Sequence, residues 1–263
     1  MKRREFLASS LAASAPSTLI AGGPATDQSR PEYYEVRQYH LRRGPQVKLT
    51  DDFLREAALP AWKKLGLGPI GVFNTSIGPD TPTVYVLIPH PSLESVATTA
   101  ARLLADPDYQ RAGASFLNAP STDPAYVRTE SALLAAFESI PRLEIPPAAA
   151  ENRPRIFELR TYESHSEKAH LKKVEMFKLG EIAIFRRTGL RPVFFGRTLI
   201  GSKLPNLTYM LTFDDMAARD KNWAAFIADP EWKKLSTTPG YTDGEIVSNI
   251  TNLLLAPTPY SQI

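Results

Sequence analysis

Apolar and polar positions change their spacing several times along the chain, and each change marks an expected element. Residues 33–41 alternate in character and are rich in aromatic and β-branched side chains, a pattern typical of a strand. The first half predicts strands at 33–41, 70–77, 83–88 and 126–137, and helices at 47–65 and 92–104. Pro60 is expected to end or kink the first helix, and Ser92 to cap the second. Asp106-Pro107 should stop the second helix, with a short turn after it.

The second half of the chain shows the same order of patterns. It predicts strands at 155–163, 191–200, 207–213 and 245–255, and helices at 167–188 and 216–228. Each half therefore has the order β-α-β-β-α-β, which is the order of a ferredoxin-like module.

Short segments of the first half also recur in the second at a constant distance of 123 residues. The matching segments are 35–39 with 158–162, 66–69 with 189–192, 75–78 with 198–201, and 105–109 with 228–232. Chance does not readily give four matches in order with a single offset. The pattern therefore indicates an internal duplication.

A ferredoxin-like module covers one face of its sheet with helices, and its other face needs a partner. A tandem copy supplies that partner. We therefore expect an α+β fold in which two tandem ferredoxin-like modules pack sheet to sheet as an intramolecular dimeric α+β barrel. The modules are expected at residues 31–140 and 155–257. The segment 141–154 between them is rich in Pro, Ala and Glu and is expected to be a semi-rigid linker.

The repeated motifs resemble those of the NIPSNAP family, within the dimeric α+β barrel superfamily. The resemblance rests on the Glu-x-Arg-x-Tyr opening strand of each half and the Gly-Leu-x-Pro turn after the first helix. It also includes the Asp-Pro-[Asp/Glu]-[Tyr/Trp] segment after the second helix, and it covers residues 33–255. It implies a tandem ferredoxin-like barrel and no established reaction.

The N-terminal segment is expected to be an export signal at residues 1–25. Lys2, Arg3 and Arg4 precede a short apolar stretch rich in Ala and Ser, which is typical of a secretory signal. The adjacent arginines followed by x-Phe-Leu resemble a twin-arginine signal. We expect cleavage between Ala21 and Asp27, a periplasmic or secreted protein, and no stable membrane insertion after the signal is removed.

Composition narrows the partners and the chemistry. The formal net charge is +3, and most of that excess lies at the N-terminus, so charge favours neither nucleic acid nor an anionic membrane as a partner. The absence of cysteine excludes disulfides, thiolate metal sites and cysteine nucleophiles. The sequence contains no Gly-x-Gly-x-x-Gly, Walker, Gly-x-Ser-x-Gly or His-Glu-x-x-His motif.

The opening strand of each half carries the candidate ligand-binding residues. They form two polar trios, Glu35, Arg37 and Tyr39 in the first half, and Glu158, Arg160 and Tyr162 in the second. Because alternate residues of a strand share a face, each trio points to one side. We expect the more apolar opposite face, which includes His40, to meet the helices, and both trios to face the barrel interior. There they either bind the carboxylate or phosphate of a ligand or form structural ion-pair networks.

No metal or other cofactor is predicted. His165 and His170 are five residues apart and lack the i,i+4 spacing that places two ligands on one helical face. Some proteins of the wider superfamily bind haem through one histidine, so either residue is a candidate axial ligand in an alternative interpretation.

Three functional hypotheses remain from the sequence. The first is an exported NIPSNAP-like protein of undetermined activity that binds a small molecule in the barrel interior. The second is an enzyme using the same cavity, either a cofactor-independent oxygenase or isomerase, or a haem-binding enzyme. The third is a structural module that binds a partner. A homodimer is a further expectation from the wider superfamily.

Overall fold

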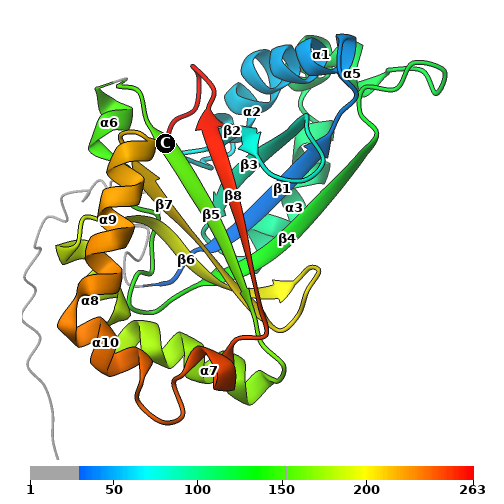
Figure 1. Ribbon diagram of the computed structural model, residues 1–263. Helices are drawn as coiled ribbons and strands as arrows, with labels where there is room; N and C mark the ends of the chain where they lie inside the picture. Colours follow the sequence, from blue (N-terminus) through cyan, green and yellow to red (C-terminus); the bar gives the residue numbers. More distant parts are fainter. Residues whose placement is uncertain (1–29, 152) are drawn as a thin grey trace, which may run out of the picture.

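The computed structural model describes residues 30–151 and 153–263, and within them eight antiparallel strands close into a barrel (Figure 1). The strand order around the barrel is β1-β3-β2-β8-β5-β7-β6-β4. The strands are β1 Tyr33–His40, β2 Gly71–Ile77, β3 Thr83–His90, β4 Arg128–Ala136, β5 Ile156–Glu163, β6 Arg191–Ile200, β7 Asn206–Phe213 and β8 Asn249–Pro257. The predicted export signal and its cleavage site lie outside the described residues.

Each half of the chain contributes four adjacent strands, and the halves join at two seams. β2 pairs with β8 at one seam, and β4 pairs with β6 at the other. The sequence thus correctly predicted an α+β barrel built from both halves. All eight strands lie in one continuous barrel wall, because these cross-half pairs satisfy the strand edges that each half would otherwise expose.

Helices lie outside the barrel, with α1 to α3 beside the first half and α7 to α10 beside the second (Figure 1). The first half contains α1 Pro45–Phe53, a π-helical turn Leu54–Ala58, α2 Leu59–Lys64, α3 Leu93–Leu104, α4 Pro107–Ala112 and α5 Ala114–Leu117. The linker contains α6 Pro147–Ala150. The second half contains α7 Glu167–Met176, a π-helical turn Phe177–Glu181, α8 Ile182–Arg187, α9 Met216–Ala228, α10 Pro230–Ser236 and α11 Asp243–Ile246.

Three elements differ from the sequence prediction. The helical path continues past Pro60 to Lys64, and the π-helical turn Leu54–Ala58 lies directly before this proline. The expected turn after α3 contains α4 and α5, and the Asp106 side chain caps α4. The last strand begins at Asn249 instead of residue 245, because a Thr242–Glu245 capping box forms α11 first.

The barrel interior forms its own apolar core, in which almost every residue comes from a strand. Tyr34 and Val36 of β1 meet Phe157 and Leu159 of β5 there. The fully buried Ile263 joins the same core, and its carbonyl accepts a hydrogen bond from Arg155 at 2.6 Å. Leu143 of the linker segment packs against this core as well. These residues fill the end of the barrel where β5 begins.

Candidate functional site

The two polar trios lie on the face of the sheet opposite to the one predicted. In the second half, Glu158 is completely buried and accepts hydrogen bonds from Arg219 and Trp223, which both belong to α9. In the first half, Tyr39 packs with Leu54 and Trp62 of the helical layer. The trios therefore face the helices, and the alternate residues of β1 and β5 face the barrel interior.

The reason is that both faces of these strands are buried, so the more apolar face does not have to meet the helices. The helices supply polar partners to the trios, whereas the interior between the opposed strands is largely apolar. A buried charge is tolerated only where such partners exist. The prediction that the trios face the interior was wrong, and the same reversal moves His40 from the helix side to the interior.

Within each trio, the predicted pairs do form. Arg160 Nη1 lies 2.8 Å from Glu158 Oε1, and Arg160 Nη2 donates to the Tyr162 hydroxyl at 3.1 Å. Burial by itself would raise the pKa of the Glu158 carboxyl, but the hydrogen bonds from Arg219 and Trp223 and the Arg160 charge lower it overall. In this half the network also includes Tyr209, whose hydroxyl donates to Tyr162 at 2.9 Å.

The first-half network has different outer partners. Arg37 Nε donates to Glu35 Oε1 at 2.8 Å, and Ser131 donates to the same oxygen. His90 Nε2 lies 3.6 Å from Glu35 Oε2. Burial would raise the pKa of Glu35, but His90, the Arg37 charge and Ser131 outweigh it and lower the pKa to about 2. Neither trio lines any of the principal pockets of the described chain, and direct ligand contact by the trios stays a prediction.

A pocket of about 340 Å³ opens inside the barrel at the end opposite Ile263, and we call it the barrel pocket. Its apolar floor comes from both halves and comprises Val36, Leu134, Leu159 and Leu253. Two hairpin tips border it, one at Asp80 between β2 and β3 and one at Lys203 between β6 and β7.

Strand register explains why the barrel pocket is apolar at its floor and polar nearer the two hairpin tips. Gln38 lies opposite Tyr85 on β3 and Glu130 on β4. In the second half, Thr161 lies opposite Thr208 and Thr251 in the same way. All six residues line the barrel pocket and form a polar layer above the floor. One further step along β1 places His40 at the mouth.

Among the described residues, His40 is the one imidazole that lines the barrel pocket. Its ring is almost fully buried, with the side chain 8% exposed. Nδ1 lies 3.3 Å from the Thr83 hydroxyl oxygen and 4.0 Å from Asp80 Oδ2. Nε2 lies 3.5 Å from Glu130 Oε1 and makes no hydrogen bond within the described chain. This nitrogen is a buried polar atom without a hydrogen-bond partner, and such atoms are uncommon in native proteins.

Two hydrogen-bonding groups near His40 are also unengaged. Within the described part of the chain, neither the Gln38 amide nor the Tyr85 hydroxyl makes a side-chain hydrogen bond. Burial raises the pKa of Tyr85 to about 12, with smaller contributions from the Glu130 and Asp80 charges. Tyr85 is therefore a neutral hydroxyl that can donate a hydrogen bond at physiological pH.

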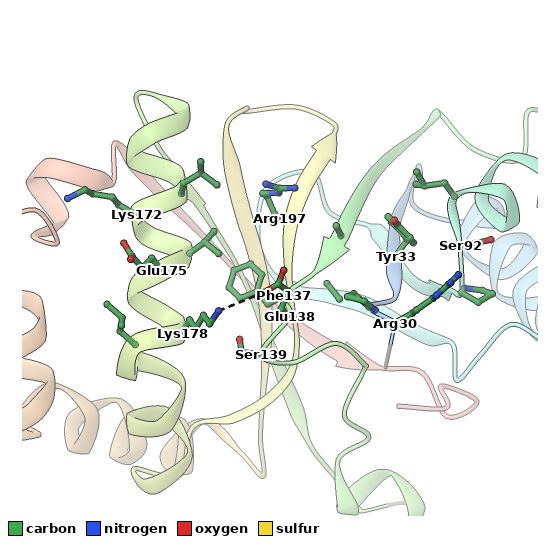
Figure 2. Close-up of a pocket in the computed structure, with 18 of the residues that line it drawn as sticks. Arg30, Tyr33, Ser92, Phe137, Glu138, Ser139, Lys172, Glu175, Lys178 and Arg197 are labelled. Carbon is green, nitrogen blue, oxygen red and sulfur yellow. Dashed lines mark ion pairs between the residues drawn. The ribbon is translucent and has the colours of Figure 1, made fainter. Parts of the chain in front are cut away.

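A larger groove of about 1260 Å³ lies outside the barrel at the β4–β6 seam, and we call it the outer groove (Figure 2). Lys178 of the π-helical turn lies on one side, and Tyr33 and Ser92 lie on the other. Lys178 Nζ is 3.8 Å from the Glu138 carboxylate. Its lining mixes acidic, basic and apolar side chains and indicates no preference for one class of ligand.

The other histidines do not form a site. His165 is exposed before α7, and His170 is buried within α7. Burial lowers the pKa of His170, and neither residue lines a principal pocket. Within residues 30–151 and 153–263, no group of three or more His, Asp or Glu side chains could hold a metal ion. No helix in these ranges is long and apolar enough to cross a membrane.

Sequence reasoning missed Gln38, His40 and Tyr85. The signal was present in the alternation of β1, which groups Val36, Gln38 and His40 on one face. The sequence showed that these residues share a face but not which face is internal.

A family model described as NIPSNAP matches two segments of the chain, residues 34–129 and 157–262. These segments correspond to the two halves of the barrel. Among curated proteins, none matches the chain.

Solved structures show the same architecture. The chain is similar in fold to provisionally named monooxygenases from Fusobacterium nucleatum and Lactobacillus acidophilus, each with a TM-score of 0.56 at 9% identity. Each comparison covers 87% of this chain, with 93% and 94% of the other chain respectively. An uncharacterized NIPSNAP-like domain protein from Burkholderia xenovorans is 24% identical, with a TM-score of 0.37, over 41% of this chain and 88% of its own. The first two comparisons show a shared fold and no more.

Proposed function

The chain belongs to the NIPSNAP family, and from that premise we propose that it binds a small amphipathic molecule in the barrel pocket. The observation that carries the proposal is a space of about 340 Å³ with an apolar floor and unengaged hydrogen-bonding groups above it. Small-molecule sites have this combination of a mainly apolar lining and a few placed polar groups.

The charges at the mouth indicate an uncharged ligand. Arg128 Nε lies 2.7 Å from Glu130 Oε1, and Arg128 Nη2 lies 3.1 Å from Asp80 Oδ2. Lys203 Nζ lies 2.9 Å from the Thr251 hydroxyl and 3.8 Å from Glu163 Oε1. Because these groups already have partners, hydrogen bonds to Gln38 and Tyr85 are the main polar interactions left for a ligand. The ligand class is a neutral molecule with an apolar body and a hydrogen-bond acceptor.

A neutral fluorescent ketone, prodan, tests this proposal because its emission shifts when it leaves water for an apolar site. Thr161→Trp should fill the barrel pocket and abolish the emission shift and uptake. Leu179→Trp is the matched control, because it adds the same indole to the outer groove. Uptake lost only with Leu179→Trp, or no uptake by the unmodified protein, contradicts the proposal.

An enzyme working in the same cavity is the second candidate function. The observation that favours it is the unpartnered Nε2 of His40 in the barrel pocket. A cofactor-independent oxygenase or isomerase is consistent with that arrangement. A haem enzyme is less favoured, because His165 and His170 lie away from the principal pockets.

We propose two further properties that extend the family assignment. Each half is a ferredoxin-like module, supported by the order β4-β1-β3-β2 in the first half and β8-β5-β7-β6 in the second. The protein is also exported to the periplasm or secreted, supported by the basic and apolar pattern at its N-terminus. Replacing Arg3 and Arg4 by Lys should retain the protein in the cytoplasm, as measured by cell fractionation, and unchanged export contradicts a twin-arginine route.

A further inference from the structure

The mouth of the barrel pocket differs between the two halves, although the halves are duplicates. β1 and β5 correspond, so His40 occupies the position that Glu163 occupies in the second half. Asp80 and Lys203 correspond in the same way at the two hairpin tips, and both have a positive φ, 51° and 62° respectively. A folding requirement shared by both halves does not call for this difference. Within the described part of the chain, an imidazole therefore lines the pocket on the side of the first half and not on that of the second.

The hydrogen bonds around Thr83 define the tautomer of neutral His40. The Thr83 hydroxyl donates its only hydrogen to the Asp80 backbone carbonyl. Thr83 Oγ1 is therefore an acceptor for His40 Nδ1, which lies 3.3 Å away and must carry the ring hydrogen. The lone pair of neutral His40 is then on Nε2, the atom without a hydrogen-bond partner.

Two carboxylates lie beside the imidazole. Glu130 Oε1 is 3.5 Å from Nε2, and Asp80 Oδ2 is 4.0 Å from Nδ1. Arg128, which lies opposite His40 on β4, is paired with both carboxylates and holds them in place. An imidazole that is oriented through Nδ1, has its Nε2 lone pair free and lies beside two carboxylates has the arrangement of a general base.

Two hydrogen-bond donors, the Tyr85 hydroxyl and the Gln38 amide, lie near His40 on the same face of the sheet. Gln38 lies opposite Tyr85 on β3, and His40 is two residues further along β1. Diagonal cross-strand neighbours are separated by about 7–8 Å, which leaves room for a ligand atom between Tyr85 and His40. The Tyr85 hydroxyl and Gln38 amide can donate to an oxygen on which negative charge develops.

This inference rests on the proposed small-molecule function of the same pocket. We propose that the barrel pocket catalyses the enolisation of a small β-dicarbonyl compound, with His40 as general base and Tyr85 and Gln38 as donors to the substrate oxygen. His40 Nε2 takes a proton from the carbon between the two carbonyl groups. The C–H electron pair becomes the carbon–carbon double bond of the enolate, and the carbonyl π pair moves onto oxygen.

The catalytic cycle is completed without a co-reactant. The proton on His40 passes to the enolate oxygen to give the enol, and the reverse sequence gives the ketone. No electrons are gained or lost overall, so neither an oxidant nor a cofactor is required. The substrate is neutral and amphipathic, as the floor and the paired charges at the mouth demand.

Benzoylacetone is a suitable probe, because its enol absorbs strongly in the near ultraviolet and a diluted enol relaxes slowly to the ketone in water. The unmodified protein should accelerate this relaxation. His40→Gln should reduce the acceleration about 100-fold, and Tyr85→Phe about 10-fold through loss of one hydrogen bond. The far-ultraviolet circular dichroism spectra of both variants should match that of the unmodified protein, which shows that each one is folded. Leu179→Trp should retain the full rate.

The orienting role of Thr83 has a separate test. Thr83→Val should lower the rate because the ring loses its acceptor at Nδ1, and Thr83→Ser should restore it. Equal rates in the two variants would show that the hydroxyl does not orient the imidazole.

Several outcomes overturn the inference. If benzoylacetone binds to the unmodified protein but its relaxation to the ketone is not accelerated, the catalytic role is contradicted and the binding function stands. An unchanged rate in His40→Gln contradicts the role of His40 as the base. Failure of benzoylacetone to bind while prodan binds excludes β-dicarbonyls as the substrate class. Failure of both probes to bind contradicts the proposed function itself.

Discussion

Replacing Glu35 with Gln should make the stability of this protein much less sensitive to acid. The substitution keeps the shape of the side chain and removes its charge. In the folded protein the Glu35 carboxylate lies 2.7 Å from Arg37 Nη2 and accepts a hydrogen bond from the Ser131 hydroxyl. The side chain is 11% exposed, so solvent screens these interactions only weakly.

The magnitude follows from the difference in pKa between the two states. The pKa of Glu35 is about 2 in the folded protein against an ordinary value of 4.5. Each unit corresponds to about 1.4 kcal/mol, so the ionised carboxylate stabilises the fold by about 3 kcal/mol at neutral pH. Because the folded pKa is the lower one, this contribution is complete above pH 4.5 and disappears as the pH falls to about 2.

The free energy of unfolding, measured with urea at several pH values, gives the test. Glu35→Gln should be about 3 kcal/mol less stable than the unmodified protein at neutral pH, and the difference should approach zero near pH 2. Glu138→Gln is the control, because that side chain is 85% exposed and the substitution should leave the curve unchanged. A difference that stays constant across the pH range would refute the reasoning, since it would show that the charge of Glu35 is not what stabilises the fold.

Three other substitutions examine separate parts of the molecule. Arg160→Met should lower the free energy of unfolding by roughly 3 kcal/mol with prodan uptake retained; lost uptake at unchanged stability would put the guanidinium in the ligand site. Gly189→Ala should cost about 1–2 kcal/mol, because φ is +83° and the added carbon lies 2.9 Å from a neighbouring side chain. The comparison is Gly44→Ala, where φ is +99° with open space around it; an equal cost would mean that the crowding is unimportant. Ile263→Ala should lower the free energy of unfolding by about 2–4 kcal/mol in a urea titration, whereas Ile145→Ala, at a side chain that is 51% exposed, should leave it nearly unchanged. Equal effects would mean that Ile263 does not contribute to the interior core of the barrel.

The duplication and the order of the elements could be predicted from the sequence because both depend on local chemistry. Strand β6 and helix α9 have the predicted bounds, 191–200 and 216–228. The π-helical turns at Leu54–Ala58 and Phe177–Glu181 also lie 123 residues apart, so the repeat extends to a distortion that the pattern did not reveal. The ion pairs of Glu35 with Arg37 and of Glu158 with Arg160 were predictable from i,i+2 spacing alone.

The candidate site depended on information that no single strand carries. Alternation along β1 assigns Glu35 and Arg37 to one face, and Gln38 and His40 to the other. Which face becomes internal is decided by what covers each side, and here Arg219 and Trp223 of a helix some sixty residues away satisfy Glu158. Closure of the barrel then brings the floor residues Val36 and Leu159 together from the two halves. The sequence by itself determined the two like halves and which residues share a face. Only the tertiary structure decided which face lines the pocket, because burial on both sides of a strand removes the contrast from which an inside could be predicted.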